Sequence, residues 1–413
     1  MIMEPTESNI SLREAALSPG PGGRRHVAAA RAVRRGNAGR AVAAPGLQHA
    51  VLLGADGMAL ILAQLLAGAG VRVSIVELDC DVAERLGTRL GQLGLAVPVL
   101  ADPVVALAAI RRATLLVQGA ATPVDSQLAE FSSDAQTVLL CETEAEARAF
   151  LSASPHRPGR AALRLAVPGS GLAEVFVTDH VSDRTGPLDS IMASLGCTPI
   201  RLLPGQSGPL PRLLTRYLAT AEALCLVGAA PWELDEALED IGFQFGPCAL
   251  MDRLGVDSVL PRRKRLQRQG CILPDPGIIR RMVAEGRLGR KSSVGWYRYP
   301  GGGGRVTDPL IEDLVREEAW FARIPQRSFD SRQMQAHIIA VLVAEAELLL
   351  AENAISHASD ADLAAVLALG FPPQLGGPLW LSDRLGPDWR RAAMLDLQAD
   401  LEGIADALPP DQP

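Results

Sequence analysis

Between residue 49 and about residue 180, short runs of apolar residues alternate with stretches whose apolar positions recur at helical spacing. Short buried strands that alternate with helices are typical of a parallel β-sheet covered by helices. This part of the chain is therefore predicted to form an α/β domain with a parallel sheet. The predicted strands are 49–54, 71–77, 96–100, 114–118, 136–141 and 161–167, with 174–178 as a further candidate.

Beyond about residue 185 the pattern becomes largely helical. The segments with helical periodicity or length are 208–227, 231–240, 275–285, 308–321, 330–354 and 359–368. The glycine run 300–304 interrupts this half, and a second helical stretch runs from about 330 to 405. The pattern predicts two mainly α-helical domains in tandem after the sheet domain.

The length of 413 residues exceeds that of one ordinary domain. The first 47 residues are rich in Arg, Ala and Gly and lack hydrophobic periodicity. They are predicted to be a disordered tail rather than an organellar transit peptide or a nucleic-acid-binding arm. The predicted order is then a sheet domain at 48–182, a first helical domain at 183–305, a linker helix at 306–324, a second helical domain at 325–406 and a tail at 407–413.

Composition narrows the class of protein. The formal net charge is −7, whereas nucleic-acid binding favours a basic face, so a nucleic-acid partner is not expected. The six cysteines show no C-x-x-C spacing and the six histidines no metal-ligand spacing, so neither a disulfide framework nor a metal site is predicted. With no run of eighteen apolar residues and no secretory signal, we expect a cytoplasmic protein without a membrane span.

The first strand and the helix after it carry the pattern of a dinucleotide-binding turn. The strand 49–54 ends in Gly54, Gly57 precedes an apolar helical stretch, and the next strand ends in Glu77. In a G-x-G-x-x-G turn the phosphates lie on the N-terminus of the helix, and an acidic residue about 20 residues further on binds the ribose. Gly54, Gly57 and Glu77 are therefore candidate NAD-binding residues.

Two positions of this turn depart from the glycine pattern. Asp56 replaces the middle glycine, which normally lets the backbone approach the pyrophosphate, and its carboxylate would set like charge against the phosphates. Ala59 replaces the last glycine and still permits close packing of helix on strand. Asp56 is therefore the residue expected to weaken or abolish NAD binding.

Three stretches of the chain resemble a known enzyme family. Residues 245–257, F-G-P-C-A-L-M-D-R-L-G-V-D, and 286–299, G-R-L-G-R-K-S-S-V-G-W-Y-R-Y, resemble the helical domain of 3-hydroxyacyl-CoA dehydrogenases. Residues 368–386 resemble the second copy of that domain in multifunctional β-oxidation enzymes, and Met58 fits the family's G-A-G-x-M-G turn. The resemblance spans roughly 48–405. It implies a Rossmann-type domain followed by two helical domains, NAD as cofactor and acyl-CoA as ligand.

The same resemblance implies that a His takes the hydroxyl proton of a 3-hydroxyacyl thioester and that a Glu orients this His. Residues 163–168 match the family's L-H-F-F-N-P, which puts Arg164 at the base position and leaves Glu174 as the orienting residue. An alignment without a gap puts Ala162 at the base position instead. Neither can act as base, because a guanidinium stays protonated and alanine has no titratable group.

Further positions differ from the family pattern. Residues 141–145 correspond to the family's S-N-T-S-S segment, so the serine is replaced by Glu144 or by Ala145, and Pro211 replaces the Asn that holds the substrate oxygen. Where the family inserts a helical hairpin that helps to hold CoA, the spacing after the second strand predicts a single helix over 81–93. The usual CoA-facing wall is therefore expected to be missing.

Other residues offer a different chemistry only weakly. His156 and His180 flank the family's active-site strands and are the candidate replacement bases, although surface histidines are the favoured interpretation. Glu142, Glu144 and Glu146 cluster near the C-terminal end of a strand, where ligands bind in open α/β sheets. The favoured interpretation is that they are first-turn helix carboxylates, which the helix dipole stabilises.

Two functions remain open. The favoured hypothesis is a catalytically impaired relative that acts as a scaffold or regulatory partner in fatty-acid and acyl-CoA metabolism. The alternative is an active NAD-dependent enzyme that oxidises 3-hydroxyacyl-CoA to 3-oxoacyl-CoA. Because single-copy members of the family dimerise through the helical domain, the tandem copy resembles such a dimer within one chain. We therefore expect a monomer, or a subunit docked on another β-oxidation subunit.

Overall fold

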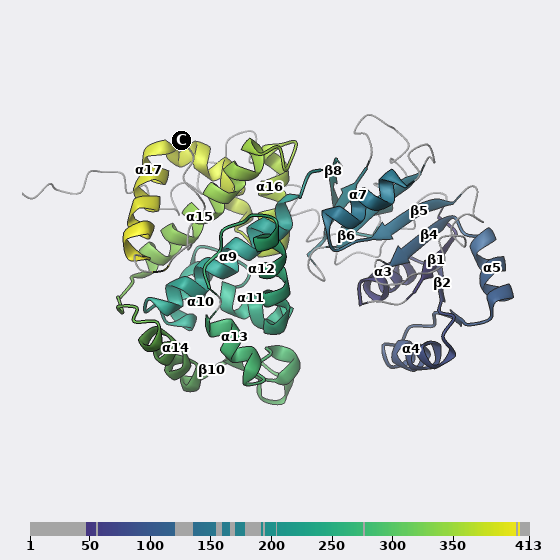
Figure 1. Cartoon of the computed structure of the whole chain (residues 1–413), viewed down its shortest axis with the longest axis horizontal. Coiled ribbons are helices and arrows are strands. Elements are labelled where there is room, and N and C mark those ends of the chain that lie inside the picture. Colours follow the sequence, from purple (N-terminus) through teal and green to yellow (C-terminus); the bar gives the residue numbers. More distant parts are fainter. Residues whose placement is uncertain are drawn as a thin grey trace, which may run out of the picture. The chain divides into compact units, whose positions relative to one another are not determined.

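The computed structural model describes residues 47–54, 57–119, 135–153, 159–165, 170–177, 191–192, 195–203, 205–275, 277–401 and 404. The chain divides between Ser207 and Gly208 into two compact units, here called the sheet unit and the helical unit (Figure 1). Each unit is described by itself. The predicted terminal tails lie outside the described residues, apart from Leu47, as does the position of Asp56.

An eight-stranded β-sheet forms the sheet unit. Its strands are β1 (His49–Leu53), β2 (Arg72–Val76), β3 (Val99–Leu100), β4 (Leu115–Gly119), β5 (Gln136–Leu140), β6 (Arg160–Leu165), β7 (Leu172–Phe176) and β8 (Thr198–Leu202). Their spatial order is β3-β2-β1-β4-β5-β6-β7-β8. The pairs from β3 to β6 are parallel, as predicted, whereas β7 is antiparallel to β6 and β8 is parallel to β7.

The sheet is buried on both faces, which explains the unbroken apolar runs of its strands. Along β1, Ala50 and Leu52 point into a core formed with α3 (Gly57–Gly68) and α4 (Cys80–Gln92). Val51 and Leu53 point into a second core, on the side of α5 (Pro103–Arg111). Successive side chains of a strand point to opposite faces, so one apolar run serves both cores.

Aspartate caps fix where two of these helices begin. The side chain of Asp79 accepts the first amides of α4, and that of Asp102 accepts the first amides of α5, at 2.8–3.0 Å. Between β2 and β3 the chain forms α4 as a single helix, as the spacing predicted. The helical hairpin that the family places here is therefore absent from this described stretch.

The helical unit is arranged around one long helix. Its α-helices are α9 (Pro209–Leu226), α10 (Pro231–Asp240), α11 (Pro247–Leu254), α12 (Val259–Arg268), α13 (Gly277–Ala284), α14 (Pro309–Phe321), α15 (Ser331–Ala351), α16 (Ala358–Ala364) and α17 (Pro378–Asp400), and β9 (Tyr297–Arg298) pairs with β10 (Val306–Thr307). α15 packs against α9, α10 and α17. Among the described residues, α15 is long and apolar enough to cross a membrane, yet 72% of its most apolar window is buried inside the protein. We interpret α15 as the core helix of this unit.

The two helical modules repeat one capping device. Asp235 of α10 accepts the amides of Cys248 and Ala249 at the start of α11, which opens with Gly-Pro. Asp362 of α16 likewise accepts the amide of Leu379 at the start of α17, which also opens with Gly-Pro. The residues that follow a left-handed glycine in each module, Phe243 and Phe371, contact each other edge to face at 5.2 Å. The geometry fits two copies of one module packed about a local two-fold.

One boundary of the predicted organisation differs from the structure. The predicted end of the sheet domain at residue 182 excluded β8, which lies within the sheet. The strand escaped notice because Pro199 and Arg201 interrupt its apolar pattern, and an edge strand tolerates both residues. The predicted separation into helical domains at 183–305 and 325–406 stays a prediction, and α9 to α17 lie in one compact unit from Gly208 onward.

Candidate functional site

The predicted dinucleotide turn begins with a left-handed glycine. Gly54 follows β1 with φ of 80°, and its amide donates to the carbonyl of Val76 at 2.9 Å. A residue with a Cβ is strained at this φ, so the sequence needs glycine here. α3 starts at Gly57, and Met58 is half-buried against the core beneath the sheet. Asp56, which is expected to spoil the pyrophosphate site, lies outside the described residues.

Glu77 lies where the sequence predicted a ribose-binding carboxylate. It follows β2 directly, is half-buried, and its amide donates to the carbonyl of Leu100 at 3.1 Å. Its Oε1 accepts the amide of Asp79 at 3.1 Å. The carboxyl ends of β1 and β2 are adjacent in the parallel sheet, so Gly54 and Glu77 lie at the same edge. These residues fit the adenosine half of a dinucleotide.

The two residues of the predicted catalytic pair face each other on adjacent strands. Arg164 of β6 and Glu174 of β7 are register partners in the antiparallel pair. Nε of Arg164 donates to Oε2 of Glu174 at 2.5 Å, and the side chains are only 8% and 0% exposed. A second guanidinium nitrogen donates to the carbonyl of Ser207 at 2.6 Å, and the group lies over the ring of Phe176. The pair is a buried ion pair with further support from the backbone.

This arrangement cannot take a proton from a substrate alcohol. A guanidinium has no free basic nitrogen near neutral pH, so Arg164 cannot act as a general base. The Glu174 carboxylate, which would orient a histidine in the family, instead compensates the buried arginine charge. Nearby, burial raises the pKa of the Cys141 thiol to about 12, so this cysteine stays protonated as well.

The acidic cluster after β5 serves helix capping. α7 (Glu144–Ser152) begins after Thr143, whose hydroxyl accepts the amide of Glu146 at 3.1 Å. The carboxylate of Glu146 accepts the amides of Glu142 and Thr143 in return, at 2.9 and 3.3 Å, which completes a capping box. Glu144 forms an ion pair with Arg148 one turn along the helix. These contacts support the interpretation of the cluster as first-turn carboxylates.

Pro211 and Arg212 belong to the helical unit and not to the sheet unit. Pro211 is the third residue of α9 and is half-buried, with no polar side-chain group to hold a substrate oxygen. Arg212 is buried, and its guanidinium donates to Glu345 of α15 at 2.5 Å and pairs with Glu352. Arg212 thereby joins α9 of the first module to α15, a packing role.

The histidines proposed as replacement bases, His156 and His180, lie outside the described residues. Among the described histidines, His49 contacts the hydroxyl of Ser74 at 3.0 Å and His337 contacts Asp400 at 2.8 Å. In the described part of the chain, no group of three His, Cys, Asp or Glu side chains could hold a metal ion.

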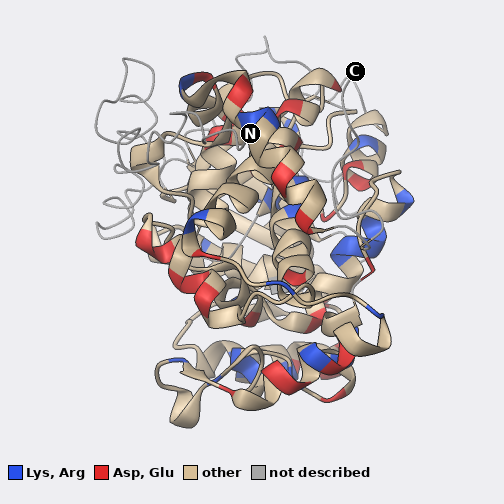
Figure 2. Cartoon of the chain, turned by 90° about the vertical axis from the view of Figure 1, so that its left-hand side faces the viewer, with Lys and Arg blue, Asp and Glu red and all other residues tan. Residues whose placement is uncertain are grey.

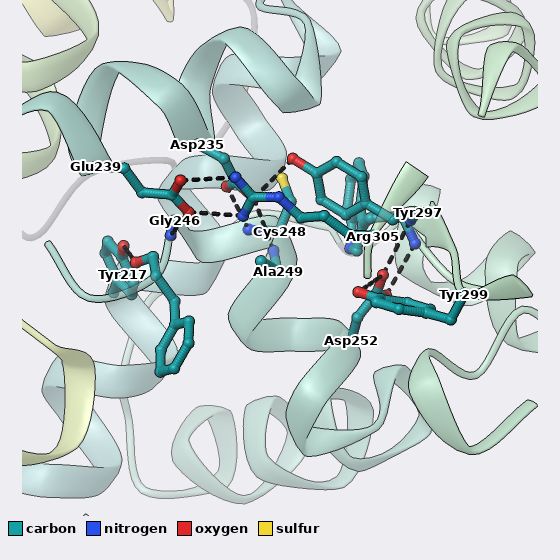
Figure 3. Close-up of polar contacts among 12 residues, drawn as sticks. Tyr217, Asp235, Glu239, Gly246, Cys248, Ala249, Asp252, Tyr297, Tyr299 and Arg305 are labelled. Carbon is teal, nitrogen blue, oxygen red and sulfur yellow. Dashed lines mark hydrogen bonds and ion pairs between the residues drawn. The ribbon is translucent and has the colours of Figure 1, made fainter. Parts of the chain in front are cut away.

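A buried polar network in the first helical module was not predicted. The hydroxyl of Tyr297 donates to Asp235 at 2.8 Å, and the hydroxyl of Tyr299 donates to Asp252 at 2.9 Å (Figure 3). Asp252 also accepts the amides of Trp296 and Tyr297 at 2.8 and 2.9 Å.

Burial raises the pKa of Asp235 to about 7 and that of Asp252 to about 6, even though the backbone amides that they accept act in the opposite direction. The two acids therefore tie α10, α11 and the 296–299 segment together from inside the module. The signal in the sequence is the pair of motifs that carry the resemblance, D-R-L-G followed by G-W-Y-R-Y, which indicate the fold but not the contacts between their side chains.

The comparisons agree with this organisation. A family model described as "3-hydroxyacyl-CoA dehydrogenase, C-terminal domain" matches residues 210–299, the span from α9 to β9. The chain is 29% identical over 219 residues to the fatty acid oxidation complex subunit alpha of Vibrio cholerae, covering 52% of this chain and 30% of that protein. These matches support membership of the 3-hydroxyacyl-CoA dehydrogenase family. This confirms the resemblance predicted from the sequence.

Other relatives point the same way. The peroxisomal bifunctional enzyme of Danio rerio is 29% identical over 194 residues, covering 42% of this chain and 26% of that protein. The chain thus spans under a third of the length of these curated relatives. Among solved structures, the dehydrogenase part of multifunctional enzyme 1 from C. elegans superposes with a TM-score of 0.61 at 18% identity, covering 87% of this chain and 88% of the other. That likeness extends the shared fold over both units.

Proposed function

We propose that this 3-hydroxyacyl-CoA dehydrogenase relative acts in fatty-acid oxidation without performing the dehydrogenase reaction. The observation that carries the proposal is the buried Arg164–Glu174 ion pair at the family's base position. Oxidation of a 3-hydroxyacyl thioester requires a group that removes the hydroxyl proton while hydride leaves the carbon. The residue matched to that role is permanently protonated.

Among the described residues, the family positions around Arg164 give no substitute for the lost base. Glu144, at the position of the family's serine, pairs with Arg148 on the helix surface. Pro211 carries no donor at the position of the family's asparagine. The single helix α4 leaves out the hairpin that helps the family to hold CoA. Each change removes a different contact to substrate, so one restored residue is not expected to restore full activity.

NAD binding is a separate question from catalysis. Gly54 and Glu77 fit the adenosine half of the cofactor, which supplies the hydride acceptor when it is bound. Asp56 opposes binding, because its charge has the same sign as that of the pyrophosphate. We propose that NAD binding is weak or absent in the natural sequence and that Asp56→Gly strengthens it.

An active dehydrogenase is the second candidate, and one observation favours it. Glu174, the family's orienting carboxylate, is retained at a buried position next to the base position. In such an enzyme the proton would have to pass to another residue, and His156 and His180 are the candidates that the sequence offers. Such an enzyme would interconvert 3-hydroxyacyl-CoA and 3-oxoacyl-CoA with NAD.

Reduction of acetoacetyl-CoA by NADH, followed by the loss of NADH absorbance, separates the two candidates. We expect no turnover above the uncatalysed rate for the natural sequence. Arg164→His should remain below any family-like rate but exceed the natural sequence, since it restores a titratable base beside Glu174. Arg112→His, an exposed change at the end of α5, is the matched control. Turnover by the natural sequence that Glu174→Gln abolishes would refute the proposal.

Thermal unfolding with NAD tests the cofactor separately. A ligand at 100 times its Kd stabilises the folded state by about 2.7 kcal/mol. We expect no shift for the natural sequence at millimolar NAD and a measurable shift for Asp56→Gly. A shift of the full size in the natural sequence would show that Asp56 is tolerated, whatever the outcome of the activity assay.

The names of the relatives suggest a partner for this chain. The bacterial relatives are named as alpha subunits of a fatty acid oxidation complex. We propose that this chain is a cytoplasmic monomer or docks on another β-oxidation subunit, with acyl-CoA as its possible ligand. Co-purification of the full chain from its own host, followed by light scattering, tests the partner. A chain that elutes alone as a homodimer would contradict it.

A further inference from the structure

A cavity of about 370 Å³ opens on the first helical module. Its lining combines charged and aromatic residues from α10, α11 and the 290–305 segment. The residues used below are Arg253, Arg290, Arg305, Phe243, Phe245 and Tyr299. The volume is within the range of small-molecule sites, which is about 300–1,000 Å³.

The charge of the cavity is positive. Three arginines line it against a single glutamate, Glu239, which leaves a net charge of +2 (3 − 1). Arg305 is already neutralised, because it binds Glu239 through two contacts of 2.6 Å (Figure 3). Arg253 and Arg290 are exposed, and neither forms an ion pair with a carboxylate of the described residues. The surplus charge therefore lies on these two side chains.

Some arginines elsewhere in the helical unit lie among acidic residues. Figure 2 shows Lys and Arg positions interspersed with Asp and Glu positions on the helices of the lower part of the view. Within the helical unit, Arg281 of α13 contacts Glu317 and Glu318 of α14. By contrast, Arg253 and Arg290 lie in one cavity and form no ion pair with a carboxylate of the described residues.

Aromatic rings hold the two arginines in place. The guanidinium carbon of Arg253 lies 4.9 Å from the centre of the Phe245 ring, and that of Arg290 lies 4.9 Å from the centre of the Tyr299 ring. A ring contact uses the flat face of a guanidinium and leaves its in-plane N–H donors available. Tyr299 is itself fixed from below by its hydrogen bond to Asp252. The donors are thus positioned before any ligand arrives.

We propose that this cavity binds a small organic phosphate through Arg253 and Arg290. Planar guanidinium groups match the oxygen geometry of phosphate and bind it through paired hydrogen bonds. The apolar wall formed by Phe243 and Phe245 contacts the organic part of the ligand. Phe243 is held rigidly between Tyr217, at 6.0 Å, and Phe371, at 5.2 Å. The site is independent of catalysis and of NAD binding in the sheet unit.

Isothermal titration calorimetry on the full chain tests the proposal with two probes, phenyl phosphate and inorganic phosphate. We expect phenyl phosphate to bind more tightly than inorganic phosphate, because only the first uses the aromatic wall. Added NaCl should weaken both, since the contacts are ionic and exposed. Equal affinity for the two probes, or binding of neither, would overturn the proposal.

Variants locate the site. Arg253→Gln and Arg290→Gln should each weaken phenyl phosphate binding about tenfold, the usual effect of one lost charge-assisted contact. The control Arg112→Gln/Arg332→Gln removes the same charge from exposed arginines elsewhere and should leave the affinity unchanged. Arg253→Lys keeps the charge but loses the paired donors, so it should bind less tightly than the natural sequence. An unchanged Kd in the Arg253→Gln/Arg290→Gln double variant, with an unchanged circular dichroism spectrum, would refute the assignment.

Discussion

Replacement of Arg164 by methionine should destabilise the sheet unit strongly. The change keeps most of the side-chain volume but leaves the fully buried Glu174 carboxylate without its guanidinium partner. Removing one member of a buried ion pair costs about 3–5 kcal/mol, because the remaining charge is uncompensated. For a domain of this size each kcal/mol lowers Tm by about 2–4 °C, so a fall of about 10 °C is expected.

The distribution of tryptophan makes the assay specific to one unit. All five tryptophans of the chain lie beyond residue 230, within the helical unit. Far-ultraviolet circular dichroism reports both units, whereas tryptophan fluorescence reports the helical unit alone. Arg164→Met should therefore lower the melting temperature seen by circular dichroism and leave the fluorescence transition in place.

Two further variants decide whether charge is the cause. Arg164→Met/Glu174→Gln removes the uncompensated charge and should recover most of the lost stability. Arg148→Met breaks the surface pair with Glu144 and should cost only about 0.3–0.5 kcal/mol. If Arg164→Met is no less stable than Arg148→Met, Arg164 does not compensate the buried charge of Glu174. The interpretation of these two residues as a stabilising ion pair would then be wrong.

Three other outcomes follow from the helical unit. Because burial raises the pKa of Asp235 to about 7, the folded state holds a proton that the unfolded state releases above about pH 4. The free energy of unfolding should therefore fall as pH rises from about 4 to 7 and level off above, measured by urea unfolding followed by tryptophan fluorescence. Asp235→Asn should reduce this dependence without removing it, because burial also raises the pKa values of Asp252 and Asp362. Arg212→Ala should lower the fluorescence-detected stability by about 2–4 kcal/mol, since it leaves Glu345 buried with one arginine fewer. Gly246→Ala should lower the stability of the helical unit by more than 2 kcal/mol, because the added Cβ would lie 2.2 Å from the Asp235 carboxyl. The control Gly87→Ala in α4, where the added Cβ has no neighbour within 4 Å, should be neutral or mildly stabilising.

The central strands were predictable because burial on both faces leaves a signal in each strand's own residues. β1 and β4 are buried on both faces, so their apolar runs are unbroken and bounded by turn residues. β8 was missed because an edge strand needs only one buried face and accepts Pro199. α17 was missed as a long helix because Gly386 and Pro387 interrupt it with a kink.

The site was predictable in part. The resemblance identified Arg164 and Glu174 as the residues at the catalytic positions, yet their contact depends on the cross-strand register of β6 and β7. Register is set by the chain between the strands and by packing on both faces, which no spacing in the sequence reports. The stacking of Arg253 on Phe245 was out of reach for the same reason, although the two residues stand eight apart in one predicted motif.

The contact between Phe243 and Phe371 has a consequence for how this protein can change. In a dimer of identical chains every substitution appears on both sides of the two-fold, so neither side can acquire a feature alone. Here the two modules are covalently joined, and each carries its own sequence. Both modules place an arginine over an aromatic ring near the Gly-Pro helix, Arg253 over Phe245 and Arg384 over Trp380, but the first adds Arg290 in the same cavity while the second continues into the long helix α17. Because the two modules are fused in one chain, substitutions in the first module can create a ligand site while the second module keeps the contacts of the shared core.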